Sequence, residues 1–226
     1  MAAPNAQHTV PCVALFDLDG TLTWRDTLLP FLRGYLARHP RRLPGLWRLA
    51  PALAGFVLLN RDRGKLKSRV IRMVMGGDTR PSVDAWAEIF VRSLMPRRLF
   101  RPAALAAVEA HRAAGDRLVL LSASPDLYVP RIGELLGFER TLCTELQWQG
   151  QRLDGNLKTA NRYGEEKLRC LAWLRTQYRD LPIVAYGNSA SDLIHLRQAD
   201  RAVLVNANAG ARRGAAEAGI AVANWT

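Results

Sequence analysis

The amino-acid sequence predicts an α/β fold, with a doubly wound parallel sheet as its core and a helical cap inserted after the first strand. Short apolar runs alternate with helix-like segments, which is typical of a parallel sheet covered by helices on both faces. A long helix-like stretch, residues 26–114, separates the first apolar run from the second. Three of the runs end in polar clusters, at the position where ligands bind in such sheets.

The individual elements can be assigned in chain order. VALF at residues 13–16 predicts a buried parallel strand. AALAAVEAHRAAG at 103–115 predicts a helix that ends at Gly115. RLVLL at 117–121 predicts the second strand, and a helix from 126 to 136 follows it. EEKLRCLAWLRTQY predicts a further helix, and IVAY at 183–186 and AVLV at 202–205 predict the third and fourth strands.

The length of 226 residues suits one domain with a large insertion, and 49% apolar residues are enough for a hydrophobic core. We therefore expect a core made of residues 10–22 and 102–226, and a helical cap made of residues 23–101. The three cysteines are scattered and odd in number, which indicates a reducing compartment. The N-terminus lacks the charge and the apolar stretch of a secretory signal, so we expect a cytoplasmic protein.

The first polar cluster is FDLDGTLT, in which Asp17 and Asp19 follow the first strand. Side chains two positions apart on extended backbone point to the same side, so both carboxylates face one site. Such a pair needs a cation, and Mg²⁺ prefers oxygen ligands. One carboxylate could act as a nucleophile and the other could transfer protons. Gly20 permits a sharp turn that brings backbone N–H groups to an anion, and Thr21 adds a hydroxyl donor.

The other clusters complete a phosphate site. Ser122, in the SAS sequence after the second strand, offers a hydroxyl and a backbone N–H to a phosphate oxygen, or alternatively caps the next helix. Lys167 supplies a fixed positive charge, and Lys158 is its rival for that role. Asn188 and Asp192, in GNSASD, offer oxygen ligands to Mg²⁺, or alternatively form an Asx turn that caps a helix. These groups match the needs of phosphoryl transfer.

The ordered motifs FDLDGTLT, LLSAS, GEEK and YGNSASDL resemble those of the haloacid dehalogenase superfamily of phosphatases. The resemblance implies a Rossmann-like core and, from the spacing, the branch with a helical cap that includes phosphoserine phosphatase. It implies that Asp17 attacks phosphorus and that Asp19 protonates the leaving oxygen and then activates water. Lys167 would stabilise charge. Phosphate would bind at a set made of Gly20, Thr21, Ser122 and Ala123.

The resemblance also implies a magnesium site at Asp17, Asp19, Asn188 and Asp192. This sequence departs from the family at Asn188, where the family usually has an aspartate. We expect weaker magnesium binding and retained activity, because Asp192 remains. Asp26 stands where phosphoserine phosphatases carry a glutamate that binds the substrate's amino group, and it could equally cap a helix.

The net charge of +12 is concentrated in one segment of the expected cap. Between Arg33 and Arg72 there are eleven Lys or Arg residues against one acid, Asp62. Such a segment indicates an anionic partner. The uncharged stretch 49–60 is too short to span a bilayer, which takes about 20 residues. It is either a buried cap helix or an element that lies in the membrane interface, with residues 38–72 in peripheral contact with the anionic inner face.

The cap also resembles that of the phosphatidylglycerophosphatase C family, on FLRGYLARHP, the apolar stretch and GEEK. A phospholipid headgroup phosphate, phosphatidylglycerophosphate, is therefore the leading substrate, and the runner-up is a small soluble phosphomonoester such as phosphoserine or histidinol phosphate. An alternative of another class is a catalytically weak membrane-binding protein on the same fold. No nucleic-acid motif and no basic patch interleaved with aromatics is present, so nucleic acid is not expected as a partner.

Overall fold

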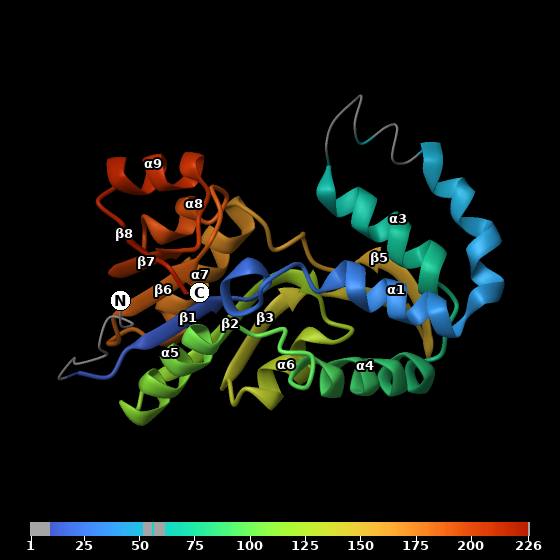
Figure 1. Cartoon of the computed structure of the whole chain (residues 1–226), viewed down its shortest axis with the longest axis horizontal. Helices are drawn as coiled ribbons and strands as arrows, with labels where there is room; N and C mark the ends of the chain where they lie inside the picture. Colours follow the sequence, from blue (N-terminus) through green and yellow to red (C-terminus); the bar gives the residue numbers. More distant parts are fainter. Residues whose placement is uncertain (1–9, 52–55, 57–61, 226) are drawn as a thin grey trace.

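The computed structural model describes residues 10–51, 56 and 62–225, and its centre is a six-stranded parallel sheet (Figure 1). The strand order is β3-β2-β1-β6-β7-β8, which is the doubly wound order of dinucleotide-binding sheets when the six strands are counted along the chain. The strands are β1 (Val13–Asp17), β2 (Arg117–Pro125), β3 (Arg140–Thr144), β6 (Ile183–Gly187), β7 (Arg201–Val205) and β8 (Ala221–Ala223). The predicted fold class is confirmed.

Alternate residues of each strand enter two different hydrophobic cores, because successive side chains of a strand point to opposite faces. Ala14 and Phe16 of β1 pack on the side of α5 (Pro102–Ala113) and α6 (Val129–Leu135). Val13 and Leu15 pack on the opposite side, against α7 (Glu165–Gln177), α8 (Leu193–Leu196) and α9 (Ala209–Glu217). The predicted helices on both faces of the sheet are therefore present.

The stretch predicted to be mainly helical extends from one end of the sheet (Figure 1). It forms α1 (Leu28–Arg38), η2 (Pro40–Leu49), α3 (Arg63–Met75) and α4 (Arg80–Leu94). Its two connections to the sheet lie side by side, since Trp24 N–H donates to the Leu99 carbonyl at 3.0 Å and Arg101 N–H donates to that of Leu22 at 2.9 Å. This pairing falls at the predicted cap boundary. Most of the stretch 49–60, with its two alternative interpretations, lies outside the described residues.

A two-stranded hairpin, β4 (Leu146–Gln149) and β5 (Arg152–Leu157), was not predicted from the sequence. It belongs to the second half of the chain and packs on α3 of the helical segment. Ser68 Oγ donates to the Gly155 carbonyl at 3.0 Å, and Gly77 N–H donates to the Leu153 carbonyl at 2.8 Å. The hairpin therefore holds α3 in place over the end of the sheet.

Helix α6 begins at Val129, three residues after the predicted start at Asp126. The backbone N–H of Asp126 donates to the Thr144 carbonyl at 2.9 Å, and its carboxylate accepts from the Leu146 N–H at 3.2 Å. These bonds keep Asp126 in the loop beyond β2. The helices predicted at 103–115 and 165–178 are confirmed within two residues.

Candidate active site

Asp17 is the last residue of β1, beside the gap where the chain order of the sheet reverses between β1 and β6. Its side chain is almost fully buried. Oδ1 accepts a hydrogen bond from Lys167 Nζ at 2.6 Å, and Oδ2 accepts one from Thr21 Oγ1 at 2.8 Å. Burial raises the pKa of Asp17, and the charge of Lys167 opposes that shift. Both oxygens are thus held in fixed directions at the carboxyl edge of the sheet.

Lys167 lies in the first turn of α7 and is also buried. Its ammonium donates to Asp17 Oδ1 and to Asp192 Oδ1, each at 2.6 Å. Burial alone would lower the pKa of Lys167, but these two carboxylates raise it above its ordinary value. Lys167 therefore stays charged, as the sequence predicted for the fixed cation. Its rival Lys158 is exposed and pairs with Glu145 at 2.8 Å. Lys158 therefore does not serve the Asp17 and Asp192 carboxylates that Lys167 contacts.

Asp19 accepts three hydrogen bonds, from Thr27 at the start of α1 and from Ser124 of β2. Oδ1 accepts from the backbone N–H and from the hydroxyl of Thr27, both at 2.7 Å, and Oδ2 accepts from Ser124 Oγ at 2.6 Å. The Thr27 hydroxyl in turn lies 2.9 Å from the Tyr128 hydroxyl. Burial, and to a smaller extent the charge of Asp26, raises the pKa of Asp19. The raised pKa favours the protonated form that a general acid requires.

Gly20 directly follows Asp19 and makes the turn within η1 (Leu18–Leu22). Its φ of +84° is accessible to glycine and strained for other residues. A Cβ at this position would lie 2.1 Å from Asn188 Nδ2. Only glycine therefore lets the turn after β1 touch the loop after β6, which brings Asn188 to the aspartates.

Asp192 closes the loop after β6 with its second oxygen. Oδ2 accepts from the backbone N–H groups of Asn188 at 3.2 Å and Ser189 at 3.0 Å, and from Ser189 Oγ at 2.7 Å. Although burial opposes it, Lys167 lowers the pKa of Asp192 to about 2. The carboxylate is therefore charged and largely saturated with donors. It orders the loop and orients Lys167, and direct contact with a metal stays a prediction.

The donor chemistry fits a hard divalent cation. Asp17 and Asp192 share the Lys167 ammonium, and Asp19 adds a third carboxyl group that lines the same cavity. The Asn188 side chain, against Gly20, adds an amide that can present an oxygen. Carboxylate, amide and carbonyl oxygens are the ligands that Mg²⁺ accepts. Asp17, the Asp19 carbonyl and Asn188 are therefore the groups that would hold it, with Asp192 beside them.

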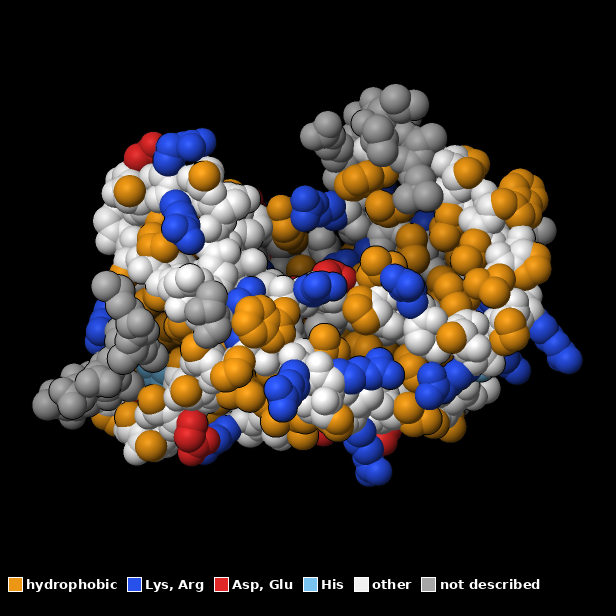
Figure 2. Space-filling view, in the orientation of Figure 1, with side chains coloured by type: hydrophobic (Ala, Val, Ile, Leu, Met, Phe, Trp, Pro, Cys, Tyr) orange, Lys and Arg blue, Asp and Glu red, His pale blue; other side chains and the backbone are white. Residues whose placement is uncertain are grey.

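The site opens into a cavity of about 510 Å³. Figure 2 shows the surface hollowed between the part of the molecule that carries α9 and the part that carries α3. Predicted residues that line the cavity are Asp17, Asp19, Gly20, Asp26, Ala123, Lys167, Asn188 and Asp192. Thr21 and Ser122 lie beneath it, fully buried. Ser122 Oγ accepts the Ser124 N–H at 3.0 Å, so it shapes the loop under the cavity, and its predicted contact with phosphate stays a prediction.

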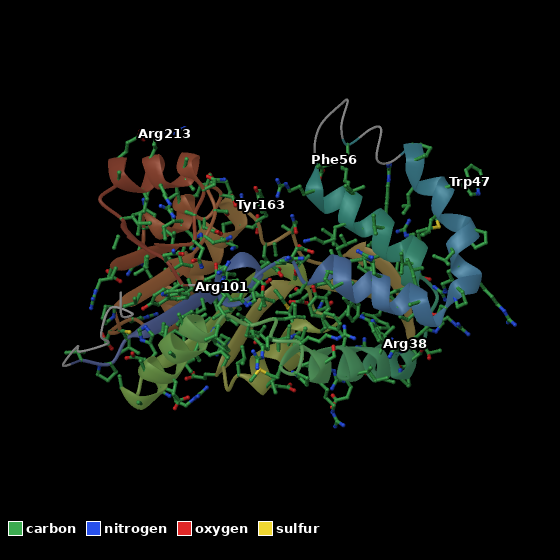
Figure 3. All side chains as sticks on the ribbon, in the orientation of Figure 1. Arg38, Trp47, Phe56, Arg101, Tyr163 and Arg213 are labelled. Carbon is green, nitrogen blue, oxygen red and sulfur yellow. The ribbon has the colours of Figure 1, made fainter. Side chains whose placement is uncertain are left out.

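Several cavity residues were missed from the sequence. Lys67 of α3 and Asn161 of the loop before α7 line it, as do Trp24, Arg63 and Tyr163. Figure 3 places Tyr163 at the opening, and the Arg63 guanidinium lies 4.7 Å from the centre of its ring. No sequence signal marks these residues, because the inserted segment and the loop before α7 come together at the cavity only in the folded chain.

Asp26 was predicted either to cap a helix or to bind the amino group of the substrate. The structure shows the cap, and Asp26 also lines the cavity. Its Oδ1 accepts the Leu29 N–H at 3.0 Å, so it caps the start of α1. It is also exposed to the cavity. A capping carboxylate retains free lone pairs, so binding of a substrate's amino group stays a prediction.

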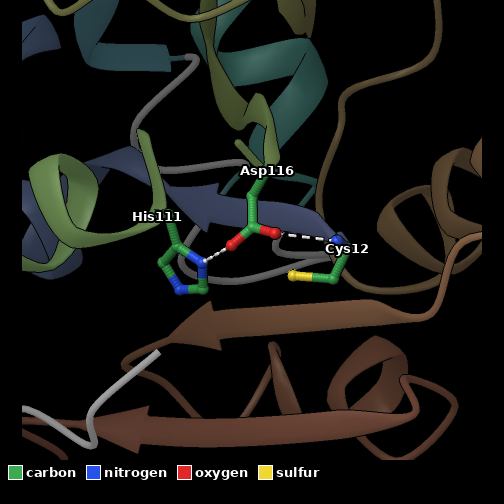
Figure 4. A group of neighbouring side chains, drawn as sticks. All are labelled: Cys12, His111 and Asp116. Carbon is green, nitrogen blue, oxygen red and sulfur yellow. Dashed lines mark hydrogen bonds and ion pairs between the residues drawn. The ribbon is translucent and has the colours of Figure 1, made fainter. Parts of the chain in front are cut away.

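A second polar cluster, shown in Figure 4, lies near the opposite ends of β1 and β2. Ligand atoms of Cys12, His111 and Asp116 lie within 4.8 Å of one another, all buried. Asp116 accepts from the Cys12 backbone N–H at 2.7 Å and from His111 Nδ1 at 2.6 Å, while His111 Nε2 faces the Tyr186 hydroxyl at 2.8 Å. Burial raises the pKa of the Cys12 thiol to about 12, which disfavours the thiolate that metals bind. The hydrogen bonds of this cluster connect α5 to the sheet, which is a structural role.

An aspartate pair, a lysine and an asparagine–aspartate loop lie together at the switch point of a doubly wound sheet, which is an arrangement typical of a hydrolase with a carboxylate-rich site. Comparison with known proteins agrees. Residues 14–197 match the family described as haloacid dehalogenase-like hydrolase, and the chain belongs to that family. It is 35% identical over 193 residues to the protein CicA of Caulobacter vibrioides, which covers 84% of each chain.

Solved structures share the fold. A protein of unknown function from Bordetella pertussis Tohama I has a TM-score of 0.80 at 23% identity, covering 96% of this chain and 100% of that one. A probable phosphoserine phosphatase from Vibrio cholerae has a TM-score of 0.68 at 16% identity, covering 96% of this chain and 63% of that one. A phospho-aspartyl intermediate analogue of phosphoserine phosphatase has a TM-score of 0.64 at 15% identity, covering 96% and 94%.

Proposed function

We propose that this enzyme hydrolyses phosphomonoesters through an aspartyl-phosphate on Asp17. The observation that carries the proposal is the division of labour between the two aspartates. Asp17 is bonded to the Lys167 ammonium, whose charge opposes the rise in the pKa of Asp17 that burial causes. Asp19 is bonded to hydroxyl and amide donors, and burial raises its pKa. Two carboxylates in environments this different suit a nucleophile and a general acid.

The two half-reactions balance on these groups. An Asp17 oxygen attacks phosphorus while the bond from phosphorus to the leaving oxygen breaks, and the Asp19 carboxyl gives its proton to that oxygen. Water then attacks phosphorus, Asp19 takes a proton from it, and the bond between Asp17 and phosphorus breaks. Lys167 holds Asp17 in line and offsets the charge of the phosphoryl group. Mg²⁺, when bound, would supply further positive charge for the phosphate oxygens.

The proposed leading substrate is a phospholipid headgroup phosphate, phosphatidylglycerophosphate. Three observations support it: the resemblance of the cap, the cations that α3 brings to the cavity, and the surface of η2. Trp47 of η2 is 72% exposed and points away from the molecule in Figure 3, and exposed Leu43 and Arg41 accompany it. Tryptophan beside arginine suits an anionic membrane interface. Among the described residues, no helix is long and apolar enough to cross a membrane.

The runner-up substrate is a small soluble phosphomonoester such as phosphoserine, which the carboxylate of Asp26 at the cavity favours. The test is phosphate release with magnesium from phosphatidylglycerophosphate in mixed micelles, phosphoserine, histidinol phosphate and an aryl phosphate. Wild type and Asp17→Asn are compared. Turnover that is lost in Asp17→Asn is expected, with the lipid preferred. Equal turnover by the two proteins would contradict the chemistry, and preference for a soluble ester would contradict the lipid substrate.

A further inference from the structure

Lys67 is a cation that reaches the active-site cavity and has no carboxylate partner in the part of the chain that the structure describes. It lies on α3, in the inserted helical segment, and its ammonium donates to two neutral oxygens, the Ala123 carbonyl and Asn161 Oδ1. Among the described residues, no Asp or Glu oxygen lies within 4.0 Å of Lys67 Nζ. Burial lowers its pKa to about 8, with Asp19 and Asp26 acting from a longer distance to raise it and Arg63 to lower it.

A half-buried ammonium that has only neutral acceptors is costly for folding alone. Such a group is retained readily where an anion joins it during function. The arginine beside it, Arg63, lines the same cavity and stacks on Tyr163. Lys67 and Arg63 therefore form a positive wall on the α3 side of the cavity, separate from the Lys167 that serves the nucleophile.

The position of Lys67 relates this wall to the leaving group. Ala123, whose carbonyl accepts from Lys67, stands between Ser122 and Ser124, and Ser124 Oγ donates to the general acid Asp19. The Lys67 ammonium therefore contacts the residue that precedes Ser124, and Ser124 is the residue that donates to Asp19. Since Asp19 protonates the leaving oxygen in the proposed mechanism, Lys67 faces the part of the substrate attached to that oxygen.

We propose that Lys67, assisted by Asn161 and Arg63, binds a second anionic group carried by the leaving alcohol, so that the substrates are phosphomonoesters with an additional phosphodiester or carboxylate. The inference rests on the proposed function and narrows its substrate class. A neighbouring cavity of about 540 Å³ shares Asn161 and is lined by Lys65, Arg69 and Arg72. Positive charge therefore continues outward from the second-anion site, in the direction an extended substrate would take.

The test compares wild type with Lys67→Met, Lys67→Arg and Lys158→Met. Lys158 is an exposed lysine outside both cavities and serves as the matched control. Four substrates are used: phosphatidylglycerophosphate in mixed micelles, its deacylated water-soluble headgroup, phosphoserine, and an aryl phosphate that has no second anion. The melting temperature of each variant shows that it is folded.

Lys67→Met is expected to lower kcat/KM about 10- to 100-fold for the preferred substrate with a second anion, mainly through KM, as befits a lost charge-assisted hydrogen bond. Turnover of the aryl phosphate should stay within about threefold, Lys67→Arg should restore most of the loss, and Lys158→Met should match wild type. A loss of kcat/KM confined to the micellar lipid would identify a lipid headgroup as the source of the second anion. An equal loss for the free headgroup or for phosphoserine would identify a soluble substrate as its source. Either result supports the second-anion site.

An equal loss for all four substrates, or no loss for any, would overturn the second-anion site while leaving the aspartyl-phosphate chemistry intact. A wild type that hydrolyses only the aryl phosphate would overturn it as well. Failure of the wild type to release phosphate from any substrate would overturn the proposed function and this inference together. The aryl phosphate therefore separates the two failures.

Discussion

At the scale of single residues, the site assigns different tasks to chemically similar groups. Asp17, Asp19 and Asp192 are all buried or cavity-lining carboxylates, but their donors differ: an ammonium and a hydroxyl for the first, hydroxyls and an amide for the second, and an ammonium and a whole loop for the third. Burial raises the pKa of Asp17 and of Asp19, whereas Lys167 lowers that of Asp192 in spite of burial. The surroundings, and not the residue type, therefore set the ionisation of each carboxyl. The surroundings of Asn188 matter in the same way, because this sequence has a neutral amide where the family usually has an aspartate.

The first prediction concerns Asn188, which supplies a neutral oxygen where a charged one is usual. Asn188→Asp should tighten magnesium binding, because a carboxylate adds charge to the ligand set. The concentration of Mg²⁺ that gives half-maximal turnover should fall, by about tenfold if the gain is near 1.4 kcal/mol. Magnesium titrations of aryl phosphate hydrolysis measure this directly. An unchanged requirement would show that the side chain at position 188 does not contact the metal.

Much of the site could be predicted at this scale. Asp17, Asp19, Asn188 and Asp192 stand in motifs at strand ends, Lys167 stands in a motif at the start of a helix, and the structure brings all of them to one cavity. The residues that hold Asp19 were missed. Thr27 meets Tyr128 across 101 positions, and Ser124 meets Asp19 across 105, so no local pattern reveals those contacts. The third letter of SAS was the available signal for Ser124.

At the scale of elements, the polar cluster at Cys12, His111 and Asp116 ties α5 to β1 and, through Tyr186, to β6. Asp116→Ala should destabilise the fold, because the buried Cys12 N–H and the His111 ring each lose an acceptor. Unsatisfied buried donors cost about 1–3 kcal/mol each, so a loss of about 2–4 kcal/mol is expected. Urea denaturation measures it. A change below about 0.5 kcal/mol, the range of ordinary surface substitutions, would contradict the structural role.

The hairpin β4–β5 offers a matched pair of glycines. Gly155 has a φ of +87°, and a Cβ there would lie 2.7 Å from the Arg72 Cα of α3. Gly150 has a φ of +58° at the hairpin turn, with no atom within 4 Å of such a Cβ. Both Ala variants incur the cost of positive φ, about 1 kcal/mol, but Gly155→Ala should cost about 1–3 kcal/mol more. Equal melting temperatures for the two variants would show that the hairpin does not pack on α3 as described.

This hairpin also marks where sequence reasoning stops at the scale of elements. Its strands are short, and the polar residues between Leu146 and Leu157 resemble a loop. Pairing of β4 with β5 and packing on α3 make it an element, and the contact of Ser68 of α3 with Gly155 joins residues 87 positions apart. Strands β3 and β8 were missed for the same reason, since each depends on a neighbouring strand and has a weak apolar pattern.

At the scale of the whole molecule, the distribution of positive charge predicts binding to anionic surfaces. The net charge is +12, and the cations of the inserted segment surround both cavities and η2. The protein should therefore bind vesicles that contain anionic lipid and not neutral ones, and binding should weaken with salt, because each basic residue near the surface contributes about 1 kcal/mol that ions screen. Vesicle co-sedimentation measures this.

The surface of η2 provides the control for that prediction. Trp47→Ala should weaken vesicle binding, whereas Trp173→Ala, at an exposed tryptophan on α7 of the sheet domain, should not. Aryl phosphate hydrolysis should be unchanged in both, since neither side chain lines the active-site cavity. Equal binding to neutral and anionic vesicles, or equal weakening by both substitutions, would contradict the membrane contact.

The central claim is that Asp17 becomes phosphorylated, and trapping that intermediate tests it most directly. In Asp19→Asn the second half-reaction lacks its base, so an aryl phosphate, whose leaving group needs little protonation, should load Asp17 and leave it loaded. Acid quenching followed by peptide mass spectrometry should find one phosphoryl group, on Asp17. A phosphoryl group on another residue, or steady turnover by an Asp17→Asn protein without any covalent intermediate, would contradict the account.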